Sequence, residues 1–511
     1  MSDTTPTRAG QLSADGRWRW DGTAWRAVEQ APLPAWASVK VRRSATWTAL
    51  AAAVTVGLLA DQALRTGRFG LAASLTFVAA AVAAILVGAL RRVESRVLVA
   101  AAALVACAFT LRASPWLLWP DLVAVLVLLG ATASIAVKGS IFDLGAAELA
   151  ARSLHATIQA SAGSAYIARP LVEARSRTRV AAPVLRGLAI ALPVGALLAG
   201  LLASADPVFA SFFNLNVDLG TLTLDVIFVA AGALAAAGLL RLAASEPLEQ
   251  VDGPKWRLGA TETLVVVAVL DAIFAAFAAA QVLAATGAAA DTLRAAGVTY
   301  ADYARSGFFQ LLWAAGITLA LLVLFGRIGD LGDNKARRAF TVLALCAIAL
   351  MLMVDAVAFR RLSLYEEAYG FTMLRLYSHV FAIWLALVFL FLAADFSGAW
   401  RRRRWFIGAT ASSALVVLLA LNLANPEAMV VAFNTSHAQT AHRIDSQYLA
   451  DLSSDATPAL LDSRASLDPA LRDQVTRAAC AGPRSYDSAW GAFNLAEMQA
   501  AAARAAVCGS R

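Results

Sequence analysis

Long apolar runs separated by short polar segments dominate the chain from residue 46 to residue 424. A helix needs about 20 mostly apolar residues to cross a membrane. A single span can satisfy its backbone amides in lipid only as a helix. We predict eleven transmembrane helices, at Thr46–Leu64, Gly70–Leu90, Val97–Leu111, Trp116–Val137, Pro183–Ala203, Thr221–Ala243, Glu262–Ala285, Gly307–Phe325, Phe340–Phe359, Leu376–Ala394 and Trp405–Leu423.

The basic residues between these runs are unevenly distributed. If the N-terminus is cytoplasmic, the inner segments hold 27 Lys and Arg residues and the outer loops hold 8. Cytoplasmic loops of membrane proteins carry such an excess. We therefore expect a multi-pass protein of the bacterial cell membrane, with its N-terminus in the cytoplasm and its C-terminus outside.

Composition supports the same class. Hydrophobic residues make up 60% of the chain and charged residues 15%, whereas soluble domains are ~45–50% apolar and ~25% charged. The net charge of +8 could indicate a nucleic-acid partner. However, the basic residues form short clusters between apolar runs rather than one basic domain, so we predict no nucleic-acid partner.

The expected organisation is all-α, with a small β module at the N-terminus. Residues 1–45 form a cytoplasmic tail, residues 46–424 the transmembrane bundle with a cytoplasmic loop at 138–182, and residues 425–511 a helical extracytoplasmic tail. Two interpretations of the loop stay open: a surface-lying linker helix or a regulatory segment. Its basic end would attract anionic headgroups of the lipid bilayer, the partner that the architecture requires.

The N-terminal tail contains a tryptophan-rich segment at 11–28. Asp15-Gly16 and Asp21-Gly22 are tight-turn dipeptides. Trp18 and Trp20 alternate with arginines, so both rings fall on one strand face, which Trp25 could join. We predict a three-stranded mini-sheet. It either docks a cytoplasmic protein through Trp18, Trp20 and Trp25 or packs as an aromatic knot against the membrane.

Cysteine usage predicts one disulfide. Cys480 and Cys508 both lie in the expected extracytoplasmic tail. Thiol pairs in an oxidising compartment commonly form disulfides. Cys107 and Cys346 fall inside predicted helices and are interpreted as small apolar packing residues.

Many polar and aromatic residues fall at one predicted membrane depth, near the outer ends of the helices. The proposed outer-face site comprises Asp206, Asp271, Tyr300, Tyr303, Arg305, Asp355, Tyr369, Arg375, His379, Asn425, Asn434 and His437. A carboxylate at mid-span costs ~2.5–3.5 kcal/mol to insert, so Asp271 should find a partner or stay protonated. If the site exists, at least one of these aspartates should contact Arg305 or Arg375. Alternatively, the residues are helix-end anchors and an interfacial aromatic belt.

Catalytic signatures are weak. The sequence contains no glycine-rich phosphate loop and no C-x-x-C pair. His437 and His442 are five residues apart, which does not place both on one helix face, so we predict no metal and no cofactor. The leading hypothesis is a non-enzymatic envelope scaffold or signalling component. The alternatives are a small-solute or ion transporter using Asp271 and the outer acid/Arg cluster, and an enzyme acting on an envelope lipid at the outer face.

Five motifs carry a family resemblance: Ser204–Phe209, Tyr300–Leu312, Tyr369–Tyr377, Asn425–Asn434 and Tyr448–Leu460. In this order and spacing they resemble the bacterial multi-pass families of unknown function 4153 and 4173, the latter more closely, over residues 180–511. The tail around Trp18 resembles the W-x-W-D-G-x-x-W modules of actinobacterial membrane proteins. The resemblance implies a membrane protein with an external tail, and no settled activity.

Overall fold

The computed structural model describes residues 18–20, 23, 25–27, 45–135 without 89 and 91, 163–164, 166–167, 170, 191, 195, 198, 201–202, 204–205, 209, 219–244, 257–285 and 307–509 without 399–404 and 488. The chain divides into two units, residues 1–41 and residues 42–511. Each unit is described by itself.

The first unit contains a short antiparallel ladder. Strand β1 (Trp18–Trp20) pairs with strand β2 (Trp25–Ala27), and Trp20 is directly opposite Trp25. The described residues of this unit contain two strands, where three were expected. The three-stranded module and its docking role stay predictions.

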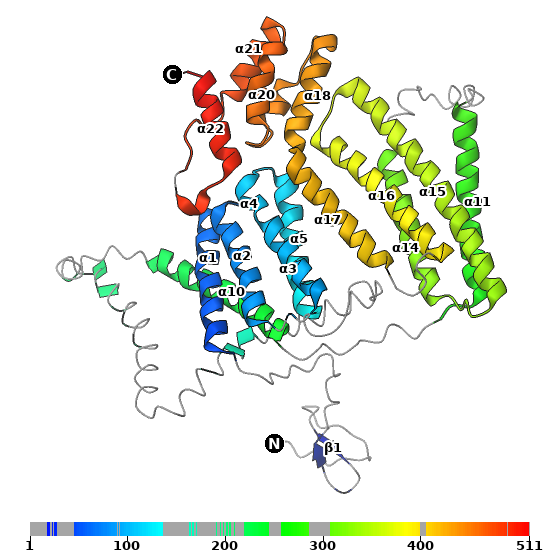
Figure 1. The fold of residues 1–511 in the computed structure, drawn as a ribbon, viewed down its shortest axis with the longest axis horizontal. Helices are drawn as coiled ribbons and strands as arrows, with labels where there is room; N and C mark the ends of the chain where they lie inside the picture. Colours follow the sequence, from blue (N-terminus) through cyan, green and yellow to red (C-terminus); the bar gives the residue numbers. More distant parts are fainter. Residues whose placement is uncertain are drawn as a thin grey trace. The chain divides into compact units, whose positions relative to one another are not determined.

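The second unit is helical, and its described residues contain nine helices long and apolar enough to cross a membrane. In chain order these are α1 (Trp47–Thr66), α3 with α4 (Val93–Ala106 and Ala108–Leu111), α5 (Pro115–Ile135), α10 (Leu219–Ala244), α11 (Ala260–Ala285), α14 (Phe308–Ile328), α15 (Asn334–Tyr369), α16 (Met373–Ser397) and α17 (Phe406–Ala424) (Figure 1). The chain is therefore a membrane protein.

The expected count of eleven is not confirmed. Helix α2 (Leu71–Val87) is apolar but has only 17 residues, and a span of that length is at the lower limit for a bilayer. The run predicted at Pro183–Ala203 lies mostly outside the described residues. The other nine predicted runs each coincide with one of the candidate spans.

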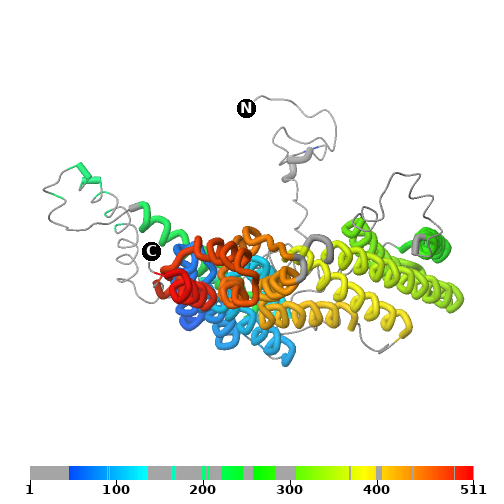
Figure 2. The backbone as a smooth tube through the Cα atoms, turned by 90° about the horizontal axis from the view of Figure 1, so that it is seen from above, coloured from blue at the N-terminus to red at the C-terminus, as the bar shows by residue number. Residues whose placement is uncertain are grey.

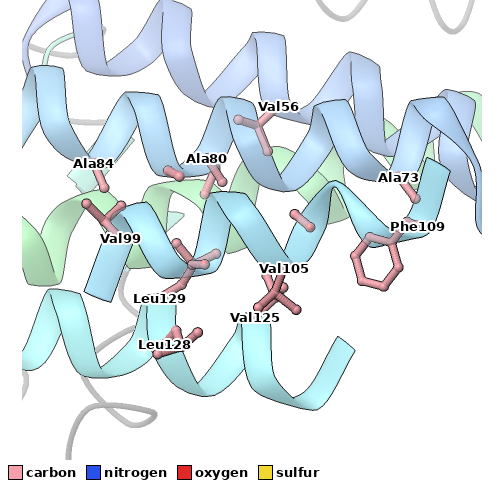
Figure 3. Close-up of a cluster of buried hydrophobic side chains, with 14 of the residues drawn as sticks. Val56, Ala73, Ala80, Ala84, Val99, Val105, Phe109, Val125, Leu128 and Leu129 are labelled. Atoms are coloured by element: carbon pink, nitrogen blue, oxygen red, sulfur yellow. The ribbon is translucent and has the colours of Figure 1, made fainter. Parts of the chain in front are cut away.

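Helices α1, α2, α3, α5 and α10 share one apolar core, which is built largely from alanine and valine with Phe109 and Leu129 (Figure 3). Small residues let α1 and α10 approach closely. A Cβ on Gly57 would lie 2.5 Å from the Val229 carbonyl oxygen, and one on Gly232 would lie 2.6 Å from the Ala60 Cβ. Such small-residue contacts are the usual way for membrane helices to pack.

Helices α11, α14, α15 and α16 form a second core around Leu322, Met351 and Phe389. Helix α17 packs on both cores, because Phe406 belongs to the second and Leu419 contacts the first. Helix α17 therefore connects the two helix groups and ends at Asn425, whose positive φ of 54° turns the chain into the next helix.

The rest of the described chain is the C-terminal helical domain. It consists of α18 (Pro426–Ala441), α19 (Ser446–Ala450), α20 (Thr457–Ser463), η2 (Arg464–Ser466), α21 (Pro469–Ala479), η3 (Trp490–Ala492) and α22 (Leu495–Val507). These helices, orange to red in Figure 2, pack around Val430, Leu460 and Val475. Met373 and Leu376 of α16 complete this core, so the domain is packed directly on a membrane helix.

Candidate functional site

A buried carboxylate joins the C-terminal helical domain to the membrane bundle. Asp455, which is 4% exposed, accepts hydrogen bonds from the backbone N–H groups of Ala113 and Ser114, both at 2.7 Å. Its other oxygen lies 3.3 Å from Nη1 of Arg112. These three partners form the connection between α4 and α5. One side chain of the domain therefore satisfies backbone donors that the membrane helices leave unpaired.

A second buried carboxylate lies beside the first. Glu427, in the first turn of α18, accepts from the Ser114 hydroxyl at 2.6 Å and from the Ser453 hydroxyl at 2.7 Å. Burial raises the pKa of Glu427 above its ordinary value of 4.5, and the two serine hydrogen bonds offset part of that rise. We call Arg112, Ser114, Glu427, Ser453 and Asp455 the polar junction.

Arg112 also closes the end of a membrane helix. Its Nε donates to the Asn422 carbonyl at 2.8 Å, and Nη2 donates to the Leu423 carbonyl at 3.3 Å. These carbonyls belong to the last turn of α17, where a cation is favoured by the helix dipole. Asn422 in turn donates to Asp121 of α5 at 2.8 Å. Arg112 thus ties together α4, α17 and the C-terminal helical domain.

Asn494 attaches helix α22 to the same end of the bundle. Its side-chain oxygen caps α22 by accepting from the Glu497 N–H at 3.1 Å. Its amide nitrogen donates to the carbonyls of Arg112 at 2.8 Å and Phe109 at 3.2 Å. The side chain is 1% exposed, so α22 is held to the α4–α5 connection by a fully buried amide.

Two residues of the predicted outer-face site, Asn425 and Asn434, and the motif residue Tyr448 make contacts between the C-terminal helical domain and neighbouring segments. Asn434 accepts from the Phe371 N–H at 3.0 Å and donates to the Phe371 carbonyl at 2.8 Å, which fixes the turn between α15 and α16. Asn425 donates to the Asp455 carbonyl at 3.0 Å. The Tyr448 hydroxyl accepts from the Met373 N–H at 2.8 Å. These contacts join the motifs at 369–377, 425–434 and 448–460, and the outer-face site as a whole stays a prediction.

The expected contact between an aspartate and Arg375 is not found among the described residues. The Arg375 guanidinium instead lies 4.3 Å from the centre of the Tyr365 ring and donates to the Gly370 carbonyl. Both carboxylate oxygens of Asp271, and one of Asp355, are buried without a hydrogen-bond partner in the described structure. Arg375 therefore has neutral partners, an aromatic ring and a backbone carbonyl, and an aspartate contact through Arg305 or Asp206 stays a prediction because both lie outside the described residues.

Some of the other predicted site residues lie outside the described part of the chain, and the rest lie on helices α11, α15, α16 and α18. Asp206, Tyr300, Tyr303 and Arg305 lie outside the described residues, as does about half of each of the two motifs that contain them. Tyr369 is the last residue of α15, and His437 lies on α18. Asp271, on α11, is the residue on which the transport hypothesis rests.

His379 belongs to a short polar chain between α15 and α16. Its Nε2 lies 3.3 Å from the Ser363 hydroxyl. Its Nδ1 hydrogen-bonds to the Arg375 carbonyl at 3.2 Å and lies 3.0 Å from a carboxylate oxygen of Glu366, which has no hydrogen-bond partner in the described structure. Glu366 is 7% exposed. Serine, histidine and carboxylate in this order are the components of a hydrolytic triad, although Ser363 also donates to the Phe359 carbonyl at 3.1 Å.

Two acidic residues at the predicted outer ends of α1 and α10 are paired with one arginine. Arg65 of α1 contacts Asp61 at 3.2 Å and also contacts Asp225 of α10. Asp61 is buried. The pairs therefore link α1 to α10 near the end of α1 that leads into α2.

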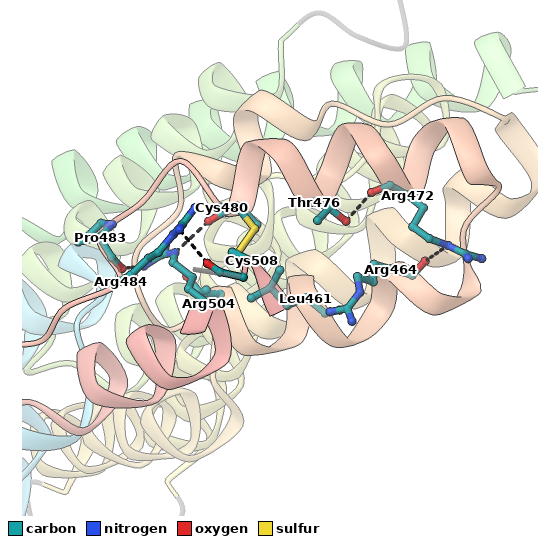
Figure 4. Close-up of a disulfide and its surroundings, with 12 residues drawn as sticks. Leu461, Arg464, Arg472, Thr476, Cys480, Pro483, Arg484, Arg504 and Cys508 are labelled. Carbon is teal, nitrogen blue, oxygen red and sulfur yellow. Dashed lines mark hydrogen bonds between the residues drawn. A yellow bond between two sulfur atoms is a disulfide. The ribbon is translucent and has the colours of Figure 1, made fainter. Parts of the chain in front are cut away.

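The expected disulfide is present. Cys480 and Cys508 are bonded, with their Cα atoms 5.7 Å apart, and join the end of α21 to the end of α22 (Figure 4). Arg504 lies beside the bond and donates to the carbonyls of Ala479 at 2.9 Å and Pro483 at 3.2 Å. Cys107 and Cys346 are free. In the described part of the chain, no three His, Cys, Asp or Glu side chains are grouped to hold a metal.

Sequence reasoning missed Glu427 and Asp455 as site residues. Both lie inside motifs that carried the family resemblance, Asn425–Asn434 and Tyr448–Leu460. Arg112, one of the 8 basic residues of the predicted outer loops, was missed as well. One available signal was the position of Arg112, Ala113 and Ser114 between two apolar helices, because that short connection leaves helix-end donors that need acceptors.

Comparison with known proteins identifies the family. A family model described as a domain of unknown function (DUF4153) matches residues 99–463, well over half of the chain. No curated protein and no solved structure matches the chain. The match begins earlier than the resemblance predicted from residue 180, and it includes the polar junction. The closer likeness to family 4173 and the likeness of the N-terminal tail stay predictions. The chain belongs to the DUF4153 family of membrane proteins.

Proposed function

We propose that this protein is a non-enzymatic scaffold or signalling component of the bacterial envelope. Its bundle anchors the C-terminal helical domain at the extracytoplasmic face, and its N-terminal tail offers the Trp module to a cytoplasmic partner. The observation that carries the proposal is the polar junction. It fixes the domain to the membrane helices through Asp455, which is buried and accepts from two backbone N–H groups and Arg112.

The chemistry of the junction favours a structural role over catalysis. Both oxygens of Asp455 and both oxygens of Glu427 are engaged by groups of the chain itself. A general acid, base or nucleophile needs an atom free to meet a substrate. Buried carboxylates with all their oxygens engaged instead give a fixed geometry, because breaking such a network is costly.

A scaffold also needs a surface for its partner. Met429 and Phe433 lie one turn apart on α18 and are 45% and 47% exposed. Exposed apolar residues that adjoin each other commonly mark protein contacts. Because α18 starts at the junction, this surface is held at a fixed position relative to the membrane. The 27 to 8 distribution of basic residues supports its extracytoplasmic location.

Site-specific photocrosslinking in living cells tests the proposal. A photoreactive residue replaces Phe433, and a matched control replaces the exposed Gln474 on α21. The scaffold proposal expects a discrete covalent adduct at position 433 and none at 474. The adduct should be lost when Asp455→Ala releases the domain. Absence of any adduct at 433, or adducts of equal yield at both positions, would contradict the proposal.

A second candidate is hydrolysis of an envelope lipid at the same face, which the Ser363–His379–Glu366 arrangement favours. Ser363 would attack the ester carbonyl of the lipid while His379 accepts the hydroxyl proton; the ester C–O bond then breaks, the alcohol leaves with the proton from His379, and water hydrolyses the acyl-serine to release the fatty acid. A fluorophosphonate probe that labels wild-type protein but not Ser363→Ala would support this enzyme. Equal labelling of both proteins, or no labelling of either, would leave the scaffold as the better account.

A further inference from the structure

A recess of about 240 Å³ opens where three parts of the chain meet. These parts are the connection between α1 and α2, the start of α5, and the first turn of α22. The recess is lined by Arg68, Phe69, Leu118, Trp119 and Glu497, together with Ala113 and Pro115. Its volume is below the ~300–1,000 Å³ of pockets that enclose drug-sized ligands. It therefore suits a headgroup rather than a whole lipid.

The recess presents one positive and one negative group side by side. Nη1 of Arg68 lies 3.6 Å from a carboxylate oxygen of Glu497. The Arg68 side chain is 61% exposed and that of Glu497 is 28% exposed. Exposed ion pairs contribute only ~0–1 kcal/mol, so a ligand can separate the two groups at little cost. Both charges are available to a ligand that carries the complementary pair.

The remaining wall is apolar and aromatic. Phe69 and Trp119 meet edge to face, with ring centres 5.7 Å apart, and Trp119 is 60% exposed. The recess lies at the ends of α1, α2 and α5, three apolar helices of the bundle. The ends of such helices lie at the depth of lipid headgroups, where tryptophan is enriched. The recess therefore offers its charged pair to the headgroup of an amphiphile and its aromatic wall to the apolar chains.

The walls of the recess are held in place. The Leu71 N–H donates to the Phe493 carbonyl at 2.9 Å, which ties the start of α2 to the segment before α22. Asn494 caps α22 and donates to the Arg112 carbonyl. These bonds fix the backbone segments that carry Arg68 and Glu497, so the walls of the recess need no rearrangement when a ligand binds.

We infer that this recess binds the headgroup of a membrane phospholipid that carries a phosphate and a primary amine. Arg68 receives the phosphate oxygens, and Glu497 accepts hydrogen bonds from the ammonium group. The glycerol and the first methylenes of the acyl chains lie against Phe69, Leu118 and Trp119. This binding site is independent of the scaffold proposal.

Alternative headgroups fit less well. Glu497 repels a purely anionic headgroup, which has no ammonium group to neutralise the carboxylate. A choline headgroup carries a positive charge but no N–H donor, so it cannot hydrogen-bond to Glu497. A preference for phosphatidylethanolamine over both phosphatidylglycerol and phosphatidylcholine is therefore the signature of the site.

Native mass spectrometry of the full-length protein tests this inference. Purified protein is incubated with phosphatidylethanolamine, phosphatidylglycerol or phosphatidylcholine of identical acyl chains, and the bound fraction is measured. Wild type should prefer phosphatidylethanolamine by about tenfold, which corresponds to ~1.4 kcal/mol. Glu497→Gln should remove that preference, and Glu497→Asp should retain part of it. Arg68→Ala should weaken binding of all three lipids, because each carries a phosphate, whereas the control Arg477→Ala, an exposed arginine of α21, should change nothing.

The opposite results would overturn the inference. Equal binding of the three lipids by wild type, or stronger binding of phosphatidylglycerol, would show that the recess does not recognise the phosphate and primary amine of the phosphatidylethanolamine headgroup. A preference that survives both Glu497→Gln and Arg68→Ala would place the lipid elsewhere. If free phosphoethanolamine competes as well as the lipid at equal concentration, the ligand is a soluble headgroup and not a membrane lipid. Thermal unfolding of each variant checks that it has folded.

Discussion

Arg112 and Asp455 are separated by 343 residues in the sequence, yet their side chains lie 3.3 Å apart. Arg112 follows helix α4 of the membrane bundle, whereas Asp455 precedes α20 of the C-terminal helical domain. The arginine also caps the end of α17, and the aspartate also binds the backbone of the α4–α5 connection. The pair is therefore the centre of a polar junction between two parts of the fold.

Replacement of Asp455 should loosen the C-terminal helical domain. Asp455→Ala leaves Arg112 and two backbone N–H groups without their acceptor, and breaking a buried pair in this way costs ~3–5 kcal/mol. We expect the domain to be digested faster by a soluble protease while the membrane helices stay resistant. Asp455→Asn, which keeps one acceptor oxygen, should show an intermediate rate. Identical digestion of wild type and both variants would mean that the junction does not hold the domain.

Glu427 should make the junction less stable as pH rises. Burial raises its pKa in the folded state above 4.5, so the folded protein binds a proton that the unfolded chain releases. Stability from this group is fully present below pH 4.5 and is lost as pH rises through the higher folded pKa. Glu427→Gln should remove this part of the pH dependence and stabilise the domain at neutral pH. Thermal unfolding of both proteins across pH measures the difference, and parallel pH curves would contradict the assignment.

Loss of the disulfide should destabilise the domain without affecting the bundle. The bond closes a loop between residues 28 positions apart, which is worth ~3–4 kcal/mol in the chain-entropy model. Cys480→Ser should therefore lower the unfolding temperature of the C-terminal helical domain, and a reductant should do the same to wild type. The control Cys346→Ser removes a free thiol and should leave that transition unchanged. A wild-type transition that is insensitive to reductant would contradict this expectation.

The orientation of the chain is open to a direct test. The 27 to 8 asymmetry of basic residues predicts that the C-terminus lies outside the cytoplasm. A reporter that is active only in the cytoplasm, fused after residue 511, should be silent, while the same reporter fused before residue 1 should be active. Activity at the C-terminal fusion would require an even number of spans.

The membrane helices could be predicted from sequence because lipid imposes a simple requirement on each span. The predicted run Phe340–Phe359 lies inside α15, but the helix extends to Asn334 and Tyr369. The sequence could not show this extension, because the added turns contain charged residues such as Arg337 and Glu366 that hydropathy treats as loop. At the Tyr369 end, hydrogen bonds from Arg361 to Gln281 and between Ser363 and His379 join these turns to α11 and α16.

The candidate site was predictable only in part. The motifs at Asn434 and Tyr448 identified segments that do meet, because both segments adjoin the ends of membrane helices. The decisive partners could not be found, since Asp455 resembles any other acidic residue of a polar tail until its distant partners are known. The expected partner of Arg375 was an aspartate, but an aromatic ring and a backbone carbonyl satisfy a guanidinium equally well.

Hydrogen exchange at the α4–α5 connection tests the polar junction most directly. In the folded protein, the amide hydrogens of Ala113 and Ser114 are bonded to Asp455, so they should exchange slowly despite lying between two helices. We predict slow exchange of a peptide covering residues 109–116 in wild-type protein reconstituted in nanodiscs, and fast exchange of the same peptide in Asp455→Ala. Fast exchange of that peptide in wild type would show that the C-terminal helical domain is not fixed to the bundle through Asp455.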